Sequence, residues 1–455
     1  METLACGHVA HADAGRMCPH LIDPTAAAGI EYVRLLTGRG LDADLCCTAC
    51  DKSRQEGATV ALAEVCEGCV AQYADNDRGF LTAWRGEAGI AERLEPLEPA
   101  IISTHLPAEL GAVLDIAPFA GSDGRSVWLA LTDSGRLMRF DADTGVCAHV
   151  ATSSVPAEPD HQPWGEHPLR RRLHVAADAR FAAVVNDFGH HGQVIDLATG
   201  TVTITLHGGD YHSETVPFSL AFVHHGGRTV AVHRTAWNRL DISDPATGLL
   251  LTPREPAAHR PGEPRPEHRL DYFHGALHSS PSGRRLADDG WVWSPVGMPA
   301  AWDLSRWLDT NPWESEDGPT RQILCHRDYH WNIPMCWVGD DLLAISGIGS
   351  DDIAILPGVR IFDVATGVEL HTFPGPRGAL FSAGRRLYAG APDGLEIWDP
   401  FTGHRTGRLP GFVPTHHHPA AGELATFHEG RLDRWRIRTS GAGHDRSMVP
   451  GTILL

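Results

Sequence analysis

Lysine is almost absent from this sequence. Lys52 is the only one among 455 residues, so nearly all of the positive charge is carried by arginine. Acidic residues outnumber basic ones by 57 to 38, which gives a formal net charge of -19 with the histidines neutral. A protein whose main partner is nucleic acid needs a basic footprint to neutralise phosphates. The acidic balance therefore argues against nucleic acid, and a basic run as short as Arg170–Arg172 does not reverse it.

Long apolar stretches are also missing. No run approaches the roughly 18 apolar residues that would cross a bilayer. The opening residues Met1–Leu4 are not followed by the charged and apolar regions of a secretory signal. Cys147, Cys325 and Cys336 are scattered singly, which is typical of a reducing compartment rather than of a disulfide framework. With a composition rich in Ala, Gly, Pro and Arg, as in many bacterial proteins, these absences predict a cytoplasmic protein that has no membrane partner.

Seven of the ten cysteines, by contrast, lie within the first 69 residues. Two Cys-x-His pairs come first, and two Cys-x2-Cys pairs follow with 15 residues between them. Thiolates on tight turns at this spacing close a tetrahedron around Zn²⁺. The sequence therefore predicts two structural zinc ions, held by Cys6, His8, Cys18, His20, Cys47, Cys50, Cys66 and Cys69.

The pairing of these eight ligands stays open at the level of sequence. Sequential and interleaved arrangements are both possible, with sites of four cysteines or of two cysteines and two histidines. Cys46 could replace Cys47, because Cys46-x3-Cys50 is also an acceptable spacing. No HxE or HExxH pattern that would indicate a catalytic zinc occurs in this segment. Zinc would instead supply folding energy, about 10 kcal/mol per site, to a segment with few large apolar side chains.

The two kinds of ligand pair together resemble those of treble-clef zinc fingers and of the zinc fingers found in ubiquitin-specific proteases. The resemblance covers only the first 69 residues or so and implies a metal-stabilised module. It carries over no ligand-binding residue.

A short phrase, Asp-x-x-Thr-Gly, recurs beyond residue 100. Such a phrase is typical of a tight turn between two antiparallel strands, in which Asp caps the turn through its side-chain oxygen and Gly supplies a positive φ angle. The copies are Asp141–Gly145, Asp196–Gly200, Asp244–Gly248, Asp363–Gly367 and Asp399–Gly403.

Pairs of β-rich runs around a turn accompany these copies. They cover residues 112–132, 173–187, 219–233, 275–290, 335–347, 378–392 and 415–428. Seven such units predict four-stranded blades repeated around an axis, which is a β-propeller. Over about residues 105 to 440 the repeats resemble WD40-like and quinoprotein-like propellers, with Trp302-Asp303 and Trp398-Asp399 as WD pairs. The resemblance implies the architecture and no particular activity.

We therefore expect a mainly β protein, a seven-bladed β-propeller with a small N-terminal α+β zinc-binding domain. Residues 1–85 would form the zinc module, 86–104 a linker helix and a possible closing strand, 105–440 the propeller and 441–455 a C-terminal tail. The helix is expected within 86–99, before Pro96 and Pro99, and residues 70–84 also have helical character. Ile101–Leu106 is the candidate to pair with residues 432–437 and close the ring.

The connections between units are unequal in length. They are long before residues 173, 275 and 335 and short before residues 378 and 415. Connections between blades share one face of a propeller, and insertions confined to one face often mark a binding face. Trp307–Trp313 and Tyr329–Asn332 add aromatic side chains there, either exposed to a partner or packed on the propeller. We expect a non-enzymatic interaction scaffold that binds a protein or peptide on this long-loop face.

An enzyme with a His-lined site at the mouth of the propeller channel, with or without a metal, is the alternative. His174, His274 and His416 occupy equivalent places in the first strands of their units, and Arg377 does so in another. His190-His191 and His416–His418 could add ligands. The sequence contains no GxSxG elbow, P-loop or GxGxxG motif, so we name no catalytic residue and no organic cofactor.

Overall fold

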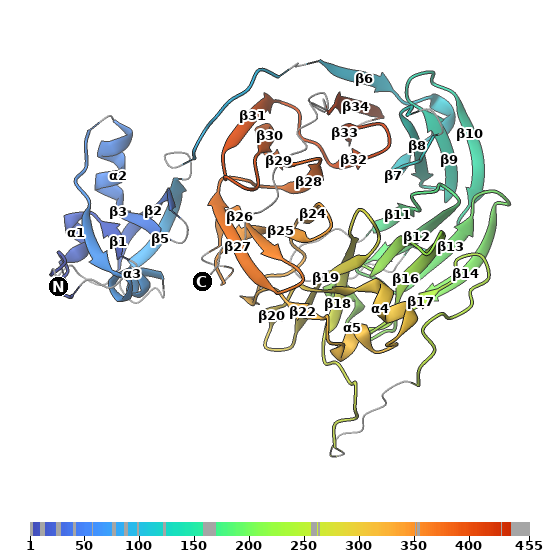
Figure 1. Ribbon diagram of the computed structural model, residues 1–455. Helices are drawn as coiled ribbons and strands as arrows, with labels where there is room; N and C mark the ends of the chain where they lie inside the picture. Colours follow the sequence, from blue (N-terminus) through green and yellow to red (C-terminus); the bar gives the residue numbers. More distant parts are fainter. Residues whose placement is uncertain are drawn as a thin grey trace, which may run out of the picture.

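The computed structural model describes residues 3–9, 14–23, 29–39, 42–56, 58–74, 79–85, 90–97, 100–121, 124–157, 170–255, 262, 264–350, 352, 355–428 and 430–437. The protein is mainly β, with a small sheet-and-helix module beside a ring of sheets (Figure 1). No helix within these ranges is long and apolar enough to cross a membrane. The expected C-terminal tail, 441–455, lies outside the described residues.

The N-terminal module is built on a five-stranded sheet in the order β4-β1-β3-β2-β5. β1 runs parallel to β3 and antiparallel to β4. A helix follows β1, β3 and β4, so three strand-to-helix junctions line the sheet. The segment 70–84, which was expected to be helical, is so only in its first part. α3 ends at Ala74, and residues 79–84 belong to β5, which pairs in parallel with β2. The bounds are β1 (Ala14–Met17), α1 (Pro19–Ile22), β2 (Ile30–Arg39), β3 (Asp42–Cys47), α2 (Thr48–Gln55), β4 (Ala63–Cys66), α3 (Glu67–Ala74) and β5 (Gly79–Arg85).

Antiparallel sheets follow one another around the ring (Figure 1). The first contains β7 (Val113–Pro118), β8 (Val127–Thr132), β9 (Arg136–Asp141) and β10 (Cys147–Thr152). The second contains β11 (Arg170–Val175), β12 (Phe181–Asp187), β13 (His191–Asp196) and β14 (Thr201–His207). The third contains β15 (Leu220–His225), β16 (Arg228–Ala236) and β17 (Arg239–Ser243), with a single bridge from Ser243 to Leu250 at its edge.

The fourth sheet carries the largest insertion. It contains β18 (Phe273–Ser279), β19 (Arg285–Val292), β20 (Val296–Gly297), β21 (Ala300–Asp303), β22 (Gln322–Ile323) and β23 (Arg327–Asp328), with α4 (Leu304–Asp309) and α5 (Glu314–Asp317) between β21 and β22. Two regular sheets follow: β24 (Met335–Val338), β25 (Leu342–Ile348), β26 (Leu356–Asp363) and β27 (Val368–Pro374), then β28 (Ala379–Ala383), β29 (Arg386–Ala391), β30 (Gly394–Trp398) and β31 (Arg405–Pro410). The last combines β32 (His416–His418), β33 (Glu423–His428) and β34 (Arg431–Arg436) with β6 (Ile101–His105).

The core of the ring lies between neighbouring sheets. All six residues of β8 and all seven of β12 are buried, because these strands have a sheet packed on each face. Leu129 and Leu131 of β8 pack in one cluster with Val184 of β12 and Ile195 of β13. Apolar side chains from successive sheets thus interlock, as in other face-to-face sheet packings.

The Asp-x-x-Thr-Gly turns join the third and fourth strands of their sheets, as the sequence predicts. Asp141 Oδ1 accepts hydrogen bonds from the backbone N–H groups of Asp143 and Thr144, at 2.9 and 3.0 Å. Gly145 has a φ of 75°, and the glycines that end the other four turns have φ of 70° to 73°. Only glycine adopts this conformation without strain, which explains the recurrence of Gly at the end of the phrase.

The ring is joined by β6, which pairs antiparallel with β34 and places Ile101 opposite Trp435. This is the pairing expected from the sequence. Arg434, only 1% exposed, reinforces it by donating to Asp143 Oδ1 at 2.8 Å and to the carbonyl of Ala142 at 3.2 Å. The last sheet is thereby fastened to the first one.

The connector before β6 is extended where a helix was expected. Residues 90–97 contain no helix and run parallel to β31, with a bridge between Glu92 and Arg405. The N–H groups of Arg93 and Glu95 donate to the carbonyls of Arg405 and Thr406, at 2.9 and 2.8 Å. The edge of β31 offers unpaired backbone groups, and satisfying them outweighs the local helix preference of this segment.

Candidate metal centres and the long-loop face

The eight predicted metal ligands come together as two separate groups in the N-terminal module. In each group the four donor atoms lie within 4.8 Å of one another. Each group has three cysteines and one histidine, so neither of the two compositions considered above, four cysteines or two of each residue, is correct. The arrangement is nested, since the first Cys-x-His pair meets the last Cys-x2-Cys pair: Cys6, His8, Cys66 and Cys69 form the outer group, and Cys18, His20, Cys47 and Cys50 form the inner group.

Strand direction explains this sorting. β1 and β3 are parallel, so Cys18, which follows β1, and Cys47, which ends β3, lie at the same end of the sheet. β4 is antiparallel to β1, and Cys66 at its end lies opposite Ala14 at the start of β1. The residues that precede β1 therefore meet Cys66 at the other end of the strands. The sheet thus carries a potential metal site at each end of its strands.

The inner group has the dimensions of a metal tetrahedron. His20 Nδ1 lies 3.2 Å from Cys50 Sγ and 3.7 Å from Cys47 Sγ. Ligand bonds of zinc at tetrahedral angles place a nitrogen and a sulfur about 3.6 Å apart. The N–H of Cys47 points at Cys18 Sγ, at 3.3 Å, and would stabilise a thiolate there. These four side chains fit a divalent metal that prefers sulfur and imidazole ligands.

The outer group repeats this geometry. His8 Nδ1 lies 3.3 Å from Cys66 Sγ and 3.5 Å from Cys69 Sγ. The N–H of Cys66 points at Cys6 Sγ at 3.4 Å, as the N–H of Cys47 does at Cys18 Sγ. In both groups the protein supplies four ligands, which is the composition of closed, structural zinc sites.

Cys46, which the sequence left as a possible substitute for Cys47, belongs to neither group. It is fully buried beside Cys18. A hydrogen bond from the Cys46 side chain, aided by the backbone N–H of Cys47, lowers the pKa of Cys18 to about 4. Cys46 therefore supports a ligand instead of being one.

Aromatic side chains gather on the long-loop face of the ring. They come from connections between sheets, from the turns after β16 and β19, and from the ends of β18 and β19, and their rings lie in mutual contact. Trp291 stacks between Phe273 and Trp331, with centroids at 4.5 and 4.6 Å, and Tyr211 stacks on Phe273 at 5.9 Å. We call this set the aromatic patch: Tyr211, Trp237, Phe273, Trp291, Trp293 and Trp331.

One layer of the patch is buried and the other is exposed to solvent. Phe273 and Trp291 are buried, while Tyr211 is 49% and Trp293 46% exposed. Of this set, the sequence marks only Trp331. A regular pattern could not have revealed the rest, because the six residues lie in five separate segments that the sheet arrangement brings together.

The aromatic residues that the sequence marks, within Trp307–Trp313 and Tyr329–Asn332, differ in burial. Trp307 of α4 is 1% exposed and packs in a core cluster, which agrees with packing on the ring and not with exposure to a partner. Trp331 packs on the patch, and its Nε1 donates to the carbonyl of Thr215 at 3.0 Å. Tyr329 is 63% exposed. Packing onto the ring thus explains most of these aromatics, and Tyr329 is the exception.

The histidines proposed for the channel do not converge. His274 is fully buried with its Nδ1 2.6 Å from Asp288 Oδ2. His174 is mostly buried, and burial lowers its pKa to about 3. His416 Nε2 lies 3.6 Å from Asp115 Oδ1. Arg377, at the fourth of these places, is exposed. Among the described residues no group of metal-ligating side chains includes any of these three histidines.

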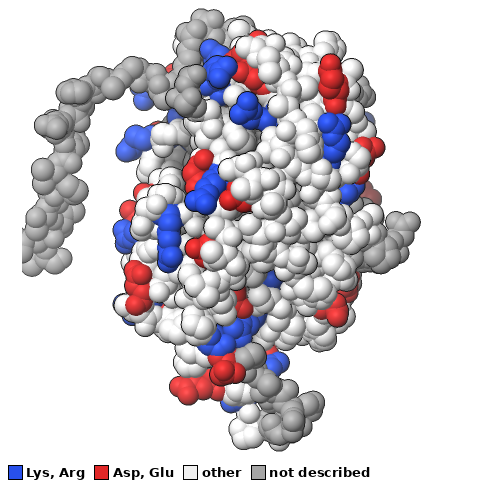
Figure 2. Space-filling view, turned by 90° about the vertical axis from the view of Figure 1, so that its right-hand side faces the viewer, with Lys and Arg blue, Asp and Glu red and all other residues white. Residues whose placement is uncertain are grey.

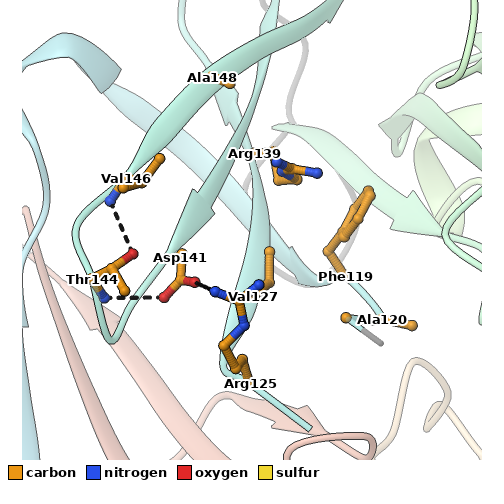
Figure 3. A pocket seen from close by; sticks show the side chains of 10 residues that line it. Phe119, Ala120, Arg125, Val127, Arg139, Asp141, Thr144, Val146 and Ala148 are labelled. Atoms are coloured by element: carbon orange, nitrogen blue, oxygen red, sulfur yellow. Dashed lines mark hydrogen bonds and ion pairs between the residues drawn. The ribbon is translucent and has the colours of Figure 1, made fainter. Parts of the chain in front are cut away.

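A groove of about 360 Å³ lies on the first sheet, at the face of the Asp-x-x-Thr-Gly turns (Figure 3). Two of the polar side chains that line it, Arg125 and Asp141, are engaged with each other. Arg125 Nη1 lies 2.9 Å from Asp141 Oδ2, and Asp141 Oδ1 caps the turn through the N–H of Thr144. The same side chains that make the turn thus line the groove, and they offer little unsatisfied polarity to a ligand.

Charge is dispersed on the side of the ring shown in Figure 2. Basic and acidic side chains alternate there among larger uncharged areas, with no continuous field of one sign. The net charge of the chain is therefore not concentrated on this side.

No protein-family model matches the chain, and no curated protein matches it either. Among solved structures, the crystal structure of the mitotic checkpoint complex contains a similar chain, with 15% identity and a TM-score of 0.45. The match covers 76% of this chain and 96% of that one. The likeness is too distant to support an argument about function, and we take the architecture from the sheets themselves.

Proposed function

We propose that this protein is a non-enzymatic interaction scaffold. Its seven sheets form the blades of one closed β-propeller, and the long-loop face of the propeller binds a protein or peptide. The module at residues 1–85 holds two structural zinc ions and is fixed beside the propeller. The exposed half of the aromatic patch is the observation that carries this proposal.

Exposed aromatic rings fixed on a rigid support are typical anchors of protein interfaces. Tyr211 and Trp293 present their rings to solvent above the buried pair Phe273 and Trp291. Because the support is already packed, burying the exposed rings against a partner costs little side-chain entropy. The Tyr211 hydroxyl and the Trp293 indole N–H add polar groups at the rim, where hydrogen bonds favour one orientation of a partner.

Zinc is the metal that these two groups of ligands fit best. Three thiolates and one imidazole at tetrahedral spacing suit Zn²⁺ and disfavour the hard cations Mg²⁺ and Ca²⁺. A structural role follows because four protein ligands leave no coordination position for a substrate. The free, scattered cysteines Cys147, Cys325 and Cys336 agree with a reducing, cytoplasmic environment.

The connector supports a rigid placement of the zinc module. Arg405 is 3% exposed and bonds with both Glu92 of the connector and Glu396 of β30. Ile90 and Leu97 pack into the clusters of the neighbouring sheets. A partner that touches the module and the propeller together would therefore meet a fixed surface instead of two independently moving domains.

Affinity capture with an alanine variant of the patch tests the binding face. Tyr211→Ala/Trp293→Ala removes the exposed rings, and Phe401→Ala removes a ring that is 43% exposed on the opposite, turn-bearing face. We expect proteins captured by the wild type and by Phe401→Ala to be lost by the double variant, with Kd for the purified partner raised more than about 30-fold. Equal capture by all three proteins would contradict the assignment of this face.

The metal content of two cysteine variants tests the zinc module. We expect Cys46→Ser to hold as many zinc equivalents as the wild type and Cys47→Ser to hold one fewer, because only Cys47 is a direct ligand. The two substitutions are chemically identical and adjacent in sequence, so each controls for the other. Loss of an equivalent from Cys46→Ser with retention in Cys47→Ser would show that the ligand assignment is wrong.

A further inference from the structure

A third group of ligands lies on the second sheet of the ring, far in sequence from the cysteines. His190, His191 and His207 offer one ring nitrogen each, and these atoms lie within 4.8 Å of one another. Their ring centroids are separated by 4.2, 4.8 and 5.5 Å. Imidazoles bound to one tetrahedral metal have centroids about 5 Å apart, as follows from Zn–N bonds of about 2.1 Å.

The fold brings these histidines together from two strands. His191 of β13 lies directly opposite His207 of β14 in the antiparallel register, so their side chains share one face of the sheet. His190 precedes β13 in the tight turn from β12. Phe188 in that turn has a φ of 61°, a left-handed conformation that costs a non-glycine residue about 1 kcal/mol. Strained turns of this kind are found at functional sites more often than elsewhere.

Asp210 lies beside the group, although it is not one of the three side chains whose donor atoms lie within 4.8 Å of one another. Its Oδ1 lies 3.5 Å from His207 Nε2 and 3.9 Å from His190 Nε2. Both distances exceed those of direct hydrogen bonds, which are usually 2.7 to about 3.2 Å. They are close to the roughly 3.3 Å that separates an oxygen and a nitrogen bound to the same tetrahedral zinc. The Asp210 side chain is 82% exposed, so the group opens to solvent.

A buried arginine supports both halves of the group. Arg234, 1% exposed, donates to the carbonyl of Gly189 at 2.8 Å, immediately before His190. It also lies against Gly208, immediately after His207, where an added Cβ would be 2.6 Å from Arg234 Nε. The N–H of Gly208 donates to the carbonyl of His190 at 2.8 Å. The backbone next to His190 and His207 is thus held in place by the buried Arg234 side chain.

We propose that His190, His191, His207 and Asp210 bind a divalent transition metal, with Zn²⁺ as the favoured ion. Neutral imidazole nitrogens with one carboxylate oxygen are ligands that Zn²⁺ takes in a tetrahedral site. The N–H of Gly209 lies 3.2 Å from His207 Nδ1. Binding through His207 Nε2 places the ring proton on Nδ1, so this hydrogen bond is given up for the bond to the metal.

The site adjoins the aromatic patch, because Tyr211 follows Asp210 directly and Gly209 lies against Ala236 and Trp237. An ion held there would order the 208–211 connection and with it the exposed ring of Tyr211. Metal binding would thereby shape one border of the long-loop face. The metal site itself does not depend on the proposed scaffold function.

Titration calorimetry of the full chain, already carrying the two metal ions of the N-terminal module, tests the proposal with added Zn²⁺. We expect one further equivalent to bind to the wild type. His191→Gln/His207→Gln keeps side-chain size and polarity but removes two ligands, and we expect it to weaken this binding by more than about 100-fold, beyond the loss seen for outer-shell partners. His149→Gln, at an exposed histidine outside the group, should bind as the wild type does.

Cobalt provides a second readout that separates this site from the module. Co²⁺ bound by the cysteine-rich groups of the module shows thiolate charge-transfer absorption, whereas Co²⁺ bound by three histidines and an aspartate shows only ligand-field bands. We expect the third equivalent to add ligand-field absorption alone, and to lose it in His191→Gln/His207→Gln. Equal Zn²⁺ binding by the wild type and this folded double variant, or absence of a third equivalent, would overturn the proposal and leave the scaffold function untouched.

Discussion

The N-terminal module and the ring of sheets differ in the side chains that fill their cores. In the main cluster of buried residues of the module, five of the 13 members are cysteines: Cys18, Cys46, Cys47, Cys50 and Cys69. The clusters between the sheets of the ring consist almost entirely of aliphatic and aromatic side chains, such as those around Leu129 and Val184. The module thus uses its ligands as its core, while the ring buries apolar area against the next sheet.

The comparison shows how size decides the source of stability. A sheet in the ring buries both faces because it has a neighbour on each side, so hydrophobic burial suffices. The module is too small to bury enough area by itself, and two bound metal ions would supply the missing folding energy. The four predictions below test this contrast, from the largest expected effect to the smallest.

Removing the metal should unfold the module and spare the ring. Each structural site contributes about 10 kcal/mol at neutral pH, more than the stability of a small domain. After chelation, hydrogen exchange measured by mass spectrometry should lose its protection over residues 14–85 and keep it over the strands from β7 to β34. Retained protection in β1 to β4 after complete metal removal would show that the module does not need its metals.

Acid should unfold the ring through its buried histidines. Burial lowers the pKa of His174 to about 3 and of His278 and His417 to about 4, below the ordinary value of 6.5. Because these folded-state pKa values are depressed, the unfolded state binds more protons between pH 6.5 and 4. Stability is therefore lost as the pH falls through this range, by up to about 1.4 kcal/mol per pH unit for each histidine.

Urea unfolding of the chelated protein at pH 7 and pH 5 would measure this loss on the ring. His174→Gln removes one of the three titrating groups and should reduce the pH dependence by about one proton. His428→Gln, at an exposed strand end, should leave the dependence unchanged. An equal pH dependence of the wild type and His174→Gln would contradict the burial of the His174 imidazole.

Breaking the buried ion pairs of Arg405 should detach the connector, residues 90–97, and so loosen the module from the ring. Arg405→Leu leaves Glu396, 7% exposed, without its cation, which costs about 3 kcal/mol. Hydrogen exchange over residues 90–97 should rise with the loss of the pairing to β31. Arg408→Leu, at an exposed position of the same strand, should change stability by less than about 0.5 kcal/mol. Equal effects of both substitutions would mean that the connector is held by something else.

Two glycine substitutions sharpen the account of the turns. Gly145→Ala meets no atom within 4 Å, so it should cost only the backbone strain of a φ of 75°, about 1 kcal/mol. Gly403→Ala places its Cβ 2.8 Å from Phe373 Cβ and should cost visibly more, by about 1 to 3 kcal/mol in addition. Thermal unfolding midpoints of the two variants would measure the difference, and an equal cost would argue against close packing at the second turn.

Local features were predictable from the sequence, and features set by strand order were not. The turn at Asp141–Gly145 needs only its own five residues, and each Cys-x-His pair marks its ligands wherever it lies. The pairing of Cys6 with Cys66 depends on the antiparallel direction of β4, which no spacing reveals. His207 likewise becomes a partner of His191 only through the register of β13 and β14.

The failed helix prediction at 86–99 has a related cause. Ala91, Glu92 and Leu94 are compatible with a helix in isolation, but Arg405 and the open edge of β31 lie within reach in the folded chain. Tertiary pairing therefore decides the conformation of this segment. The sequence leaves Trp307 either exposed or packed for the same reason, because its burial depends on how α4 packs on the third and fourth sheets.

The pairing of β6 with β34 also determines the order in which the parts of the chain can fold during synthesis. Thr104 of β6 meets Arg434 of β34, 330 residues further along the chain. At a translation rate of about 5–20 residues per second, β6 waits roughly 16–66 s for its partner. The N-terminal module has all eight of its candidate metal ligands long before then, whereas the ring exposes an unpaired strand edge until the last sheet emerges. On the ribosome the smaller, metal-dependent part can be finished first, and the larger part is the one that needs protection while it waits.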